Sequence, residues 1–266
     1  MKKRKKNKLR SKLRKGTKKK KKSKSKTRLR RSKSKELKII DVPLSKQINK
    51  GTKASHGEID YHYQNYSNII DYLRNIKAKN ICLFENSSIH LDINDIKKGI
   101  FILYDMKIFI KNIKMCLKSG NILVPIILNL ITGEGNHANI LLINKKDKTI
   151  ELYEPHGART SSSEMDGVVG IYRKKIKVLI KFWKNILSEY KIINAVDYQE
   201  GTAFQMQRDP ANHSGFCVTW TILFVHYRLL NMNIKLSLLM KYIAKKITTR
   251  KLLQYAKYIE DNIKGK

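Results

Sequence analysis

Three side chains of this sequence could together hydrolyse a carbonyl compound: those of His137, Glu154 and Cys217. A thiolate attacks a carbonyl carbon, an imidazole takes and returns the proton, and a carboxylate fixes the imidazole by binding one of its nitrogens. Taken singly, each has an ordinary structural explanation, as a cross-strand polar pair or as an inert buried thiol. The catalytic hypothesis therefore depends on the elements that would bring the three together.

A β-hairpin is predicted over residues 135–157, because the polar patch Asn144 to Asp147 separates two short apolar runs rich in β-formers. Side chains alternate between the two faces of a strand, and directly opposed Cβ atoms lie roughly 5 Å apart. We centre the turn between Lys145 and Lys146. The predicted pairs are then Leu141 with Ile150, Asn139 with Leu152, and His137 with Glu154.

The nucleophile is expected at the start of a buried helix. Residues 209–215 resemble a loop, with Pro, Asn, Ser and Gly close together, and from Cys217 onward the chain is apolar on nearly every helical face. The partial positive charge of a helix N-terminus and a nearby imidazolium both stabilise a thiolate. Cys217 is therefore the candidate nucleophile, whereas His90 and His226 are interpreted as structural.

The order His, acidic residue, Gln, Cys resembles that of the adenovirus-protease and SUMO-protease superfamily of cysteine peptidases. Tyr153-Glu154-Pro155-His156-Gly157 is similar to the stretch around the acidic triad member of adenovirus protease. Gly215-Phe216-Cys217 followed by Trp220 resembles the start of the Cys-bearing helix, above all in members from large cytoplasmic DNA viruses. The resemblance covers about residues 123–230, and it implies a papain-like cysteine peptidase that needs neither cofactor nor metal.

The sequence departs from the family pattern in three places. Ala138 follows the His, where many members have Trp. The oxyanion Gln usually lies about six residues before the Cys, whereas Gln207 is ten residues before Cys217 and the alternative, Gln205, is twelve. Ser214-Gly215 could also match the family's Cys-Gly pair, which would give a serine variant or an inactive enzyme. We prefer Cys217 because the buried helix begins there.

The charge of the chain is large and uneven. The formal net charge is +36 over 266 residues, and the first 35 residues hold 22 Lys/Arg and no acid. This composition predicts a disordered basic tail over residues 1–36 that binds DNA or RNA without sequence preference, followed by a cysteine peptidase domain over residues 37–266. No signal peptide, membrane span or membrane partner is expected. The sparse set Cys82, Cys116 and Cys217 argues for a reducing compartment and against disulfides or structural zinc.

The predicted fold is α+β, with a small central mixed sheet, the Cys217 helix packed against it and other helices around it. Residues 37–57 are interpreted as a linker or an ordering arm. Hydrophobic periodicity predicts helices over Tyr61 to Ile76, Lys107 to Leu117, Ile171 to Tyr190 and Met232 to Ile263, the last as one or two helices, and strands over Ile81 to Phe84, Leu123 to Thr132 and Ile192 to Tyr198. Pro125 should confine the start of its strand to an edge or a strand end.

The predicted function is that of a cysteine endopeptidase that processes viral structural proteins. The family implies substrates with small residues, often Gly, near the cleaved bond. Two alternatives stay open: a deubiquitinase-like or SUMO-protease-like isopeptidase acting on host conjugates, and an inactive basic virion protein that binds nucleic acid. The expected location is the virion and the cytoplasm of the infected cell, with the nucleus as the alternative because of the basic tail.

Overall fold

The computed structural model describes residues 38–46, 67–76, 80–92, 99–102, 105–132, 135–155, 176–198 and 216–264. The chain divides into two units, Met1–Glu36 and Leu37–Lys266, and all described residues belong to the second. The basic tail, the two candidate glutamines Gln205 and Gln207, and the competing Ser214 lie outside the described residues. Within the described part of the chain, no helix is both long and apolar enough to span a membrane.

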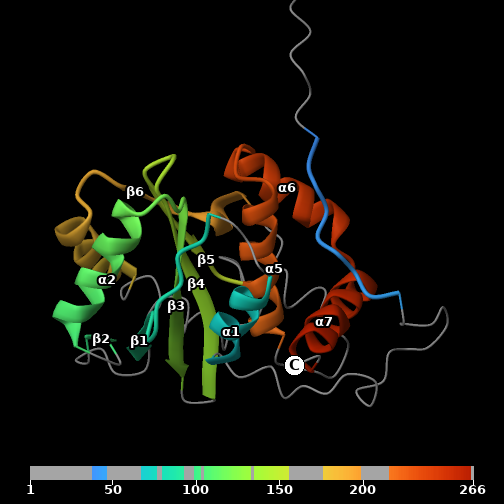
Figure 1. Cartoon of the computed structure of the whole chain (residues 1–266), viewed down its shortest axis with the longest axis horizontal. Coiled ribbons are helices and arrows are strands. Elements are labelled where there is room, and N and C mark those ends of the chain that lie inside the picture. Colours follow the sequence, from blue (N-terminus) through green and yellow to red (C-terminus); the bar gives the residue numbers. More distant parts are fainter. Residues whose placement is uncertain are drawn as a thin grey trace, which may run out of the picture. The chain divides into compact units, whose positions relative to one another are not determined.

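A mixed six-stranded sheet with the order β2-β1-β3-β4-β5-β6 forms the centre of the second unit (Figure 1). Its strands are β1 (Ser88–Asp92), β2 (Ile100–Ile102), β3 (Leu123–Thr132), β4 (Gly135–Asn144), β5 (Thr149–Tyr153) and β6 (Lys191–Asn194). The β1–β3 and β5–β6 pairs are parallel, whereas β1–β2, β3–β4 and β4–β5 are antiparallel. The predicted α+β class with a mixed sheet is therefore confirmed.

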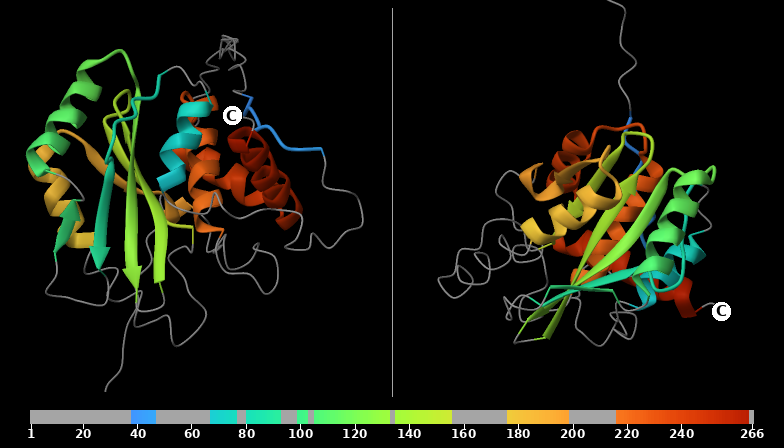
Figure 2. Two further views of the ribbon diagram at one scale, coloured as in Figure 1. Left: turned by 60° about the horizontal axis from the view of Figure 1, so that its bottom comes forward. Right: turned by 90° about the vertical axis from the view of Figure 1, so that its left-hand side faces the viewer.

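Helices cover both faces of the sheet (Figures 1 and 2). One face carries α1 (Ser67–Asn75), α5 (Cys217–Leu230), α6 (Leu236–Lys246) and α7 (Thr249–Lys264). The other face carries α2 (Met106–Lys118) and a helix over residues 176–186. Each layer has its own apolar core against the sheet, because the central strands are buried on both faces.

Several predicted elements match the structure. The helix predicted over Lys107 to Leu117 is α2, the buried strand Leu123 to Thr132 is β3, and the basic C-terminal region forms the two helices α6 and α7. The N-terminal arm is ordered where it is described, because the side chain of Asn231 bonds both the N–H and the carbonyl of Ile40.

Two predicted strands are wrong in part. Ile81 makes only an isolated bridge to Leu123, and the strand of this region is β1, which begins at Ser88 after a turn in which Asn86 has a φ of 56°. The strand predicted to run to Tyr198 ends at Asn194, where the chain enters the 3-10 helix η3 (Ala195–Tyr198). Short apolar runs have no periodicity that separates strand from helix or loop.

Pro125 lies in the central strand β3, paired with Leu142 of β4. On the other side of β3, pairing with β1 starts only at Ile127. Pro125 therefore lies in the part of β3 that β1 does not reach. Its missing N–H removes no hydrogen bond to β1, so β3 can be a central strand although it contains a proline near its start.

The β4–β5 hairpin forms as predicted, but its register differs by two residues. The structure pairs Leu141 with Leu152, Ile143 with Ile150 and Ile140 with Tyr153, so the predicted pairs Leu141–Ile150, Asn139–Leu152 and His137–Glu154 are wrong. The turn holds four residues, 145–148, and Lys148 closes it with a φ of 49°. A shift of two residues keeps every side chain on its predicted face. His137 and Glu154 thus stay on the same side of the hairpin as diagonal neighbours.

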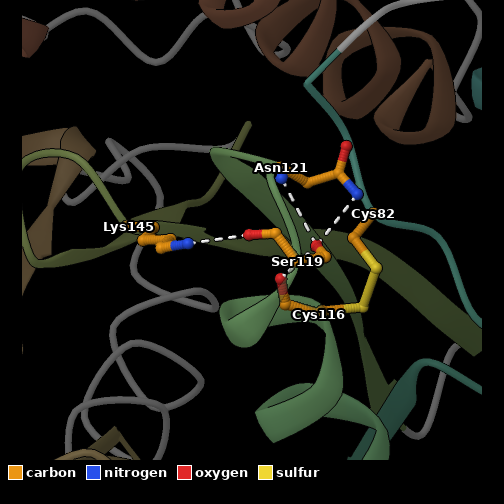
Figure 3. The surroundings of a disulfide bond; sticks show 5 residues. All are labelled: Cys82, Cys116, Ser119, Asn121 and Lys145. Atoms are coloured by element: carbon orange, nitrogen blue, oxygen red, sulfur yellow. Dashed lines mark hydrogen bonds between the residues drawn. A yellow bond between two sulfur atoms is a disulfide. The ribbon is translucent and has the colours of Figure 1, made fainter.

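Cys82 and Cys116 form a disulfide, with Cα atoms 5.6 Å apart (Figure 3). The prediction of unpaired cysteines is therefore wrong for these two, because residues separated by 34 positions are brought together only by the packing of α2 on the sheet. The end of α2 is also held by Ser119, whose carbonyl accepts a hydrogen bond of 2.7 Å from Lys145 Nζ of the hairpin turn. The disulfide leaves Cys217 as the free thiol of the chain.

We expect the double variant Cys82→Ser/Cys116→Ser to lower the free energy of unfolding by about 2–4 kcal/mol, because a crosslink restricts the unfolded chain. Urea denaturation of both proteins, with and without reductant, measures the difference. Reductant should lower the stability of the wild type to that of the variant and leave the variant unchanged. Equal stability of the two proteins without reductant would contradict the crosslink.

Candidate active site

His137 and Glu154 form a short ion pair at one end of the hairpin. Their side chains meet through His137 Nε2 and Glu154 Oε1, 2.6 Å apart, and they are only 16% and 6% exposed. His137 lies on β4, and Glu154 follows the last residue of β5. The two side chains therefore meet as predicted, but across a diagonal of the hairpin and not as directly opposed residues.

Asn139, two residues after His137 on the same strand face, holds the other oxygen of the carboxylate. Its Nδ2 donates to Glu154 Oε2 at 2.6 Å, and its side chain is fully buried. Continuing the β4–β5 register by one residue places Glu154 opposite Asn139. Both oxygens of Glu154 are thus bound, one by the imidazole and one by an amide, which fixes the plane of the carboxylate.

Cys217 is the first residue of α5, as predicted, and it is buried. Its side chain hydrogen-bonds with that of His137. Because Nε2 of the imidazole is bound by Glu154, Nδ1 is the nitrogen left for the thiol. The backbone N–H of a residue in the first turn has no acceptor within its own helix, so the N–H of Cys217 is available to a developing oxyanion.

The surroundings of His137 favour its protonated form. Burial lowers the pKa of His137, but the Glu154 carboxylate and the hydrogen bonds with Cys217 and Glu154 outweigh burial and raise this pKa to about 10. The protonated imidazole thus lies beside the sulfur of Cys217, where it can donate a proton during acyl transfer. Among the described residues, no group of His, Cys, Asp and Glu is arranged to hold a metal ion.

Two polar contacts hold α5 against the hairpin that carries His137. Arg228, near the C-terminal end of α5, binds Glu151 of β5 through two hydrogen bonds of 2.8 and 2.7 Å, and both side chains are at most 2% exposed. Burial raises the pKa of Glu151 even though the guanidinium lowers it. Closer to Cys217, Thr221 Oγ1 donates to the carbonyl of Ala138 at 3.2 Å.

The residue after His137, Ala138, is buried, and its backbone carbonyl accepts the Thr221 hydroxyl of α5.

The remaining histidines considered from the sequence occupy packed positions. The Nδ1 atom of His90 lies 3.3 Å from Asn129 Nδ2 on the neighbouring strand. His226 Nδ1 lies 3.0 Å from the Tyr255 hydroxyl, and burial lowers the pKa of His226 to about 4. Sequence reasoning did not find Asn139, Thr221 or the Arg228–Glu151 pair, because none of them forms a recognisable motif. An Asn two residues from a candidate base, on the same face of the predicted strand, is the one signal that could have found Asn139.

No protein-family model matches the chain. A protein of Acanthamoeba polyphaga mimivirus, whose name is that of an ankyrin repeat protein, is 30% identical over 183 residues, which cover 65% of this chain and 23% of that protein. The chain thus spans about a quarter of the length of this relative. The described residues form a sheet flanked by helices, unlike the stacked helical repeats that give ankyrin proteins their name.

Three solved structures illustrate what the chain is similar to. The ASFV protease is 13% identical with a TM-score of 0.32, covering 53% of this chain and 45% of that chain. The SUMO protease Ulp1 is 10% identical with a TM-score of 0.35, covering 73% and 74%. The Legionella pneumophila effector protein RavZ is 14% identical with a TM-score of 0.39, covering 68% and 49%. All three TM-scores are below 0.5.

The raised pKa of His137 predicts how stability depends on pH. From the ordinary value of 6.5 up to about 10, the folded protein holds a proton on His137 that the unfolded chain has lost. The stabilisation is complete below pH 6.5 and is lost as the pH rises toward 10. We expect the difference in unfolding free energy between the wild type and His137→Gln to shrink between pH 6.5 and 9.5. Urea denaturation at several pH values measures it, and parallel pH curves for the two proteins would contradict a raised pKa.

Proposed function

We propose that this chain is a cysteine peptidase of the adenovirus-protease and SUMO-protease type, with Cys217 as the nucleophile, His137 as the base and Glu154 as the residue that orients the base. One observation carries the proposal: a single imidazole is bound through Nε2 by a buried carboxylate and also hydrogen-bonds with a thiol at a helix N-terminus. This is the arrangement of nucleophile, base and orienting group that acyl transfer requires.

Hydrolysis proceeds in two steps through a thioester. In the first, the thiol proton is held on His137 while Cys217 Sγ attacks the carbonyl carbon of the substrate. As the tetrahedral intermediate collapses, the C–N bond breaks and His137 returns the proton to the leaving amine. In the second, His137 takes a proton from water, the hydroxide attacks the thioester, and the C–S bond breaks to release the acid and regenerate the thiol. Glu154 stabilises the imidazolium in both steps.

The oxyanion of both steps needs hydrogen-bond donors. The backbone N–H of Cys217 is one, and by resemblance to the family the side-chain amide of Gln207, or of Gln205, is the second. Both glutamines precede Cys217 in the segment outside the described residues.

The substrate proposed is a viral structural protein with small residues near the cleaved bond, and the alternative is a ubiquitin-like or SUMO-like conjugate. Residues 1–35, with 22 Lys/Arg, are proposed to bind nucleic acid through their charge. Peptides ending in Gly-Gly or Gly-x-Gly and fluorogenic ubiquitin-type substrates distinguish the two substrate classes. Cleavage of the ubiquitin-type substrates without cleavage of the peptides would favour the isopeptidase.

We expect Cys217→Ser and His137→Ala each to abolish nearly all cleavage, and the double variant to be no worse than either, because the two side chains act as one unit. Labelling with a thiol-reactive activity probe provides a readout that needs no known substrate, since Cys217 is the free thiol. The wild type should be labelled rapidly, His137→Ala slowly and Cys217→Ser not at all.

Ser214→Ala is the control for the competing alignment, and it should cleave like the wild type. Loss of cleavage in Ser214→Ala, with near-wild-type cleavage in Cys217→Ser, would transfer the nucleophile to Ser214. An unlabelled wild type that cleaves nothing would instead favour the inactive virion protein.

Asn139 is expected to act as a positioning residue through Glu154. Asn139→Leu removes the hydrogen bond to Glu154 Oε2 and leaves the carboxylate less well held. We expect kcat to fall roughly 10-fold with KM unchanged, and the acid limb of the pH–rate profile to move to higher pH, because a lost hydrogen bond disfavours the charged carboxylate. Steady-state kinetics across pH measure both effects.

Asn129→Leu is the matched control for Asn139→Leu. Asn129 is also a buried Asn of the sheet, but its amide lies against His90 and not against the proposed triad. Asn129→Leu should lower stability without moving the pH–rate profile. An equal shift of the profile in both variants would mean that Asn139 acts only through the packing of the sheet.

A further inference from the structure

The two helices on the sheet face opposite α5 repeat one sequence pattern. Residues 106–114 of α2 read MKIFIKNIK, and residues 176–184 read IKVLIKFWK, with lysine at the second, sixth and ninth positions of both. In each helix the buried apolar side chains between the lysines pack in the core against the sheet, where Phe109 and Trp183 make a ring contact at 6.5 Å. The two helices therefore lie on the same face of the sheet and contact each other (Figure 2).

These outer faces form two rows of lysines, which we call the lysine face. It consists of Lys107, Lys111, Lys114 and Lys118 of α2 and Lys177, Lys181 and Lys184 of the second helix, all exposed. Residues three and four apart fall on one side of a helix, so each set is a continuous row. At 1.5 Å rise per residue, the α2 row is about 16 Å long.

Among the described residues, no acidic side chain neutralises the charge of the lysine face. Neither helix contains an acidic residue; Asp105 caps the start of α2, and Glu189 follows the second helix. Within the described part of the chain, no ion pair joins any of the seven lysines to a carboxylate, whereas Lys257 on the opposite helical layer is paired with both Glu260 and Asp261. Seven like charges that repel one another are stabilised by a polyanion.

The side chains of the lysine face fit one kind of polyanion, duplex nucleic acid, better than an acidic protein or an anionic membrane. Lysine is depleted from the buried centre of protein–protein interfaces, which argues against an acidic protein as the occupant. The exposed large apolar side chains of the two helices are few and not aromatic, namely Met106, Ile108, Met115 and Val178. The exposed aromatic anchors typical of membrane interfaces are missing from this described face. Duplex nucleic acid carries one negative charge per roughly 1.7 Å, so about 16 Å of it offers roughly ten phosphates to one lysine row.

We propose that the lysine face is a binding surface for the phosphate backbone of double-stranded nucleic acid, separate from the basic residues 1–35. Binding releases counterions and has no sequence preference, because ammonium groups contact phosphates and not base edges. The surface belongs to the folded unit, on the helical layer that α5 does not occupy. Its occupation does not depend on the proposed peptidase activity.

The test measures the affinity of the full chain for a 20-base-pair duplex of arbitrary sequence by fluorescence anisotropy, over a series of salt concentrations. One variant replaces the four α2 lysines with Gln (K107Q/K111Q/K114Q/K118Q), and a second replaces the other three (K177Q/K181Q/K184Q). The matched control removes three charges from exposed positions of the opposite layer, K245Q/K246Q/R250Q.

Each lost phosphate contact lowers the slope of log K against log salt by about 0.9. The α2 variant should therefore lose up to about 3.6 from the slope and the second variant up to about 2.7, while the control keeps the wild-type slope. Slopes that are equal in wild type, face variants and control would overturn the proposal and leave nucleic-acid binding to residues 1–35.

A second experiment measures the binding of the same proteins to phosphatidylcholine vesicles with and without phosphatidylserine. Loss of vesicle binding in the face variants, with duplex binding unchanged, would make the face a lipid surface and overturn the proposal. Loss of duplex binding with the far-UV circular dichroism and thermal midpoint of the wild type supports it. The assay uses no cleavage, so an inactive peptidase leaves its outcome unaffected.

Discussion

The candidate site depends on how α5 is held against the β4–β5 hairpin. His137 and Glu154 come from one hairpin, but Cys217 arrives on a helix that begins far along the chain. Arg228 and Glu151, which are 77 residues apart, form a buried bidentate pair near one end of this helix, and the Thr221–Ala138 bond holds it close to the other. Two fixed points along a rigid helix define where its first residue lies, so a pair near the far end of α5 helps set the position of the thiol.

Holding α5 against the hairpin with a buried ion pair costs free energy. Its desolvation cost is high, and apolar residues of the same shape often give equal or greater stability. The pair fixes the geometry of the contact, because the guanidinium of Arg228 donates two parallel hydrogen bonds to the carboxylate in one orientation. Nη1 of Arg228 donates a third hydrogen bond, to the carbonyl of Ile234 after α5. The helix is thus fixed in register along the strand, which close-packed aliphatic side chains do not enforce as strictly.

The sheet divides the chemistry of the molecule between its two helical layers. The layer with α5 supplies the thiol and is buried deeply, with nearly every residue of that helix inside the core. The layer with α2 and the helix over residues 176–186 covers the sheet with apolar side chains, and the lysines of both helices are exposed. The disulfide Cys82–Cys116 ties α2 to the segment that leads into β1. Substitutions of the lysine face lie on the other side of the sheet from Cys217. The nucleic-acid proposal and the peptidase proposal can therefore be tested with separate variants.

The sequence by itself determined the elements and faces that form the candidate site. The apolar run after Cys217 indicated a buried helix, and the polar patch Asn144 to Asp147 between two apolar runs indicated a hairpin. The alternation of side chains along its strands placed His137 and Glu154 on one side of it. These are properties of single segments, set by periods of 3.6 and 2 residues. Tertiary structure decided the rest: the two-residue shift in register from a four-residue turn, the amide of Asn139 on Glu154, the pairing of Cys82 with Cys116, and the contacts that fix α5. Such contacts join residues from 15 to 83 positions apart. No local pattern encodes a partner at that distance, because the free energy that selects it comes from packing the whole core.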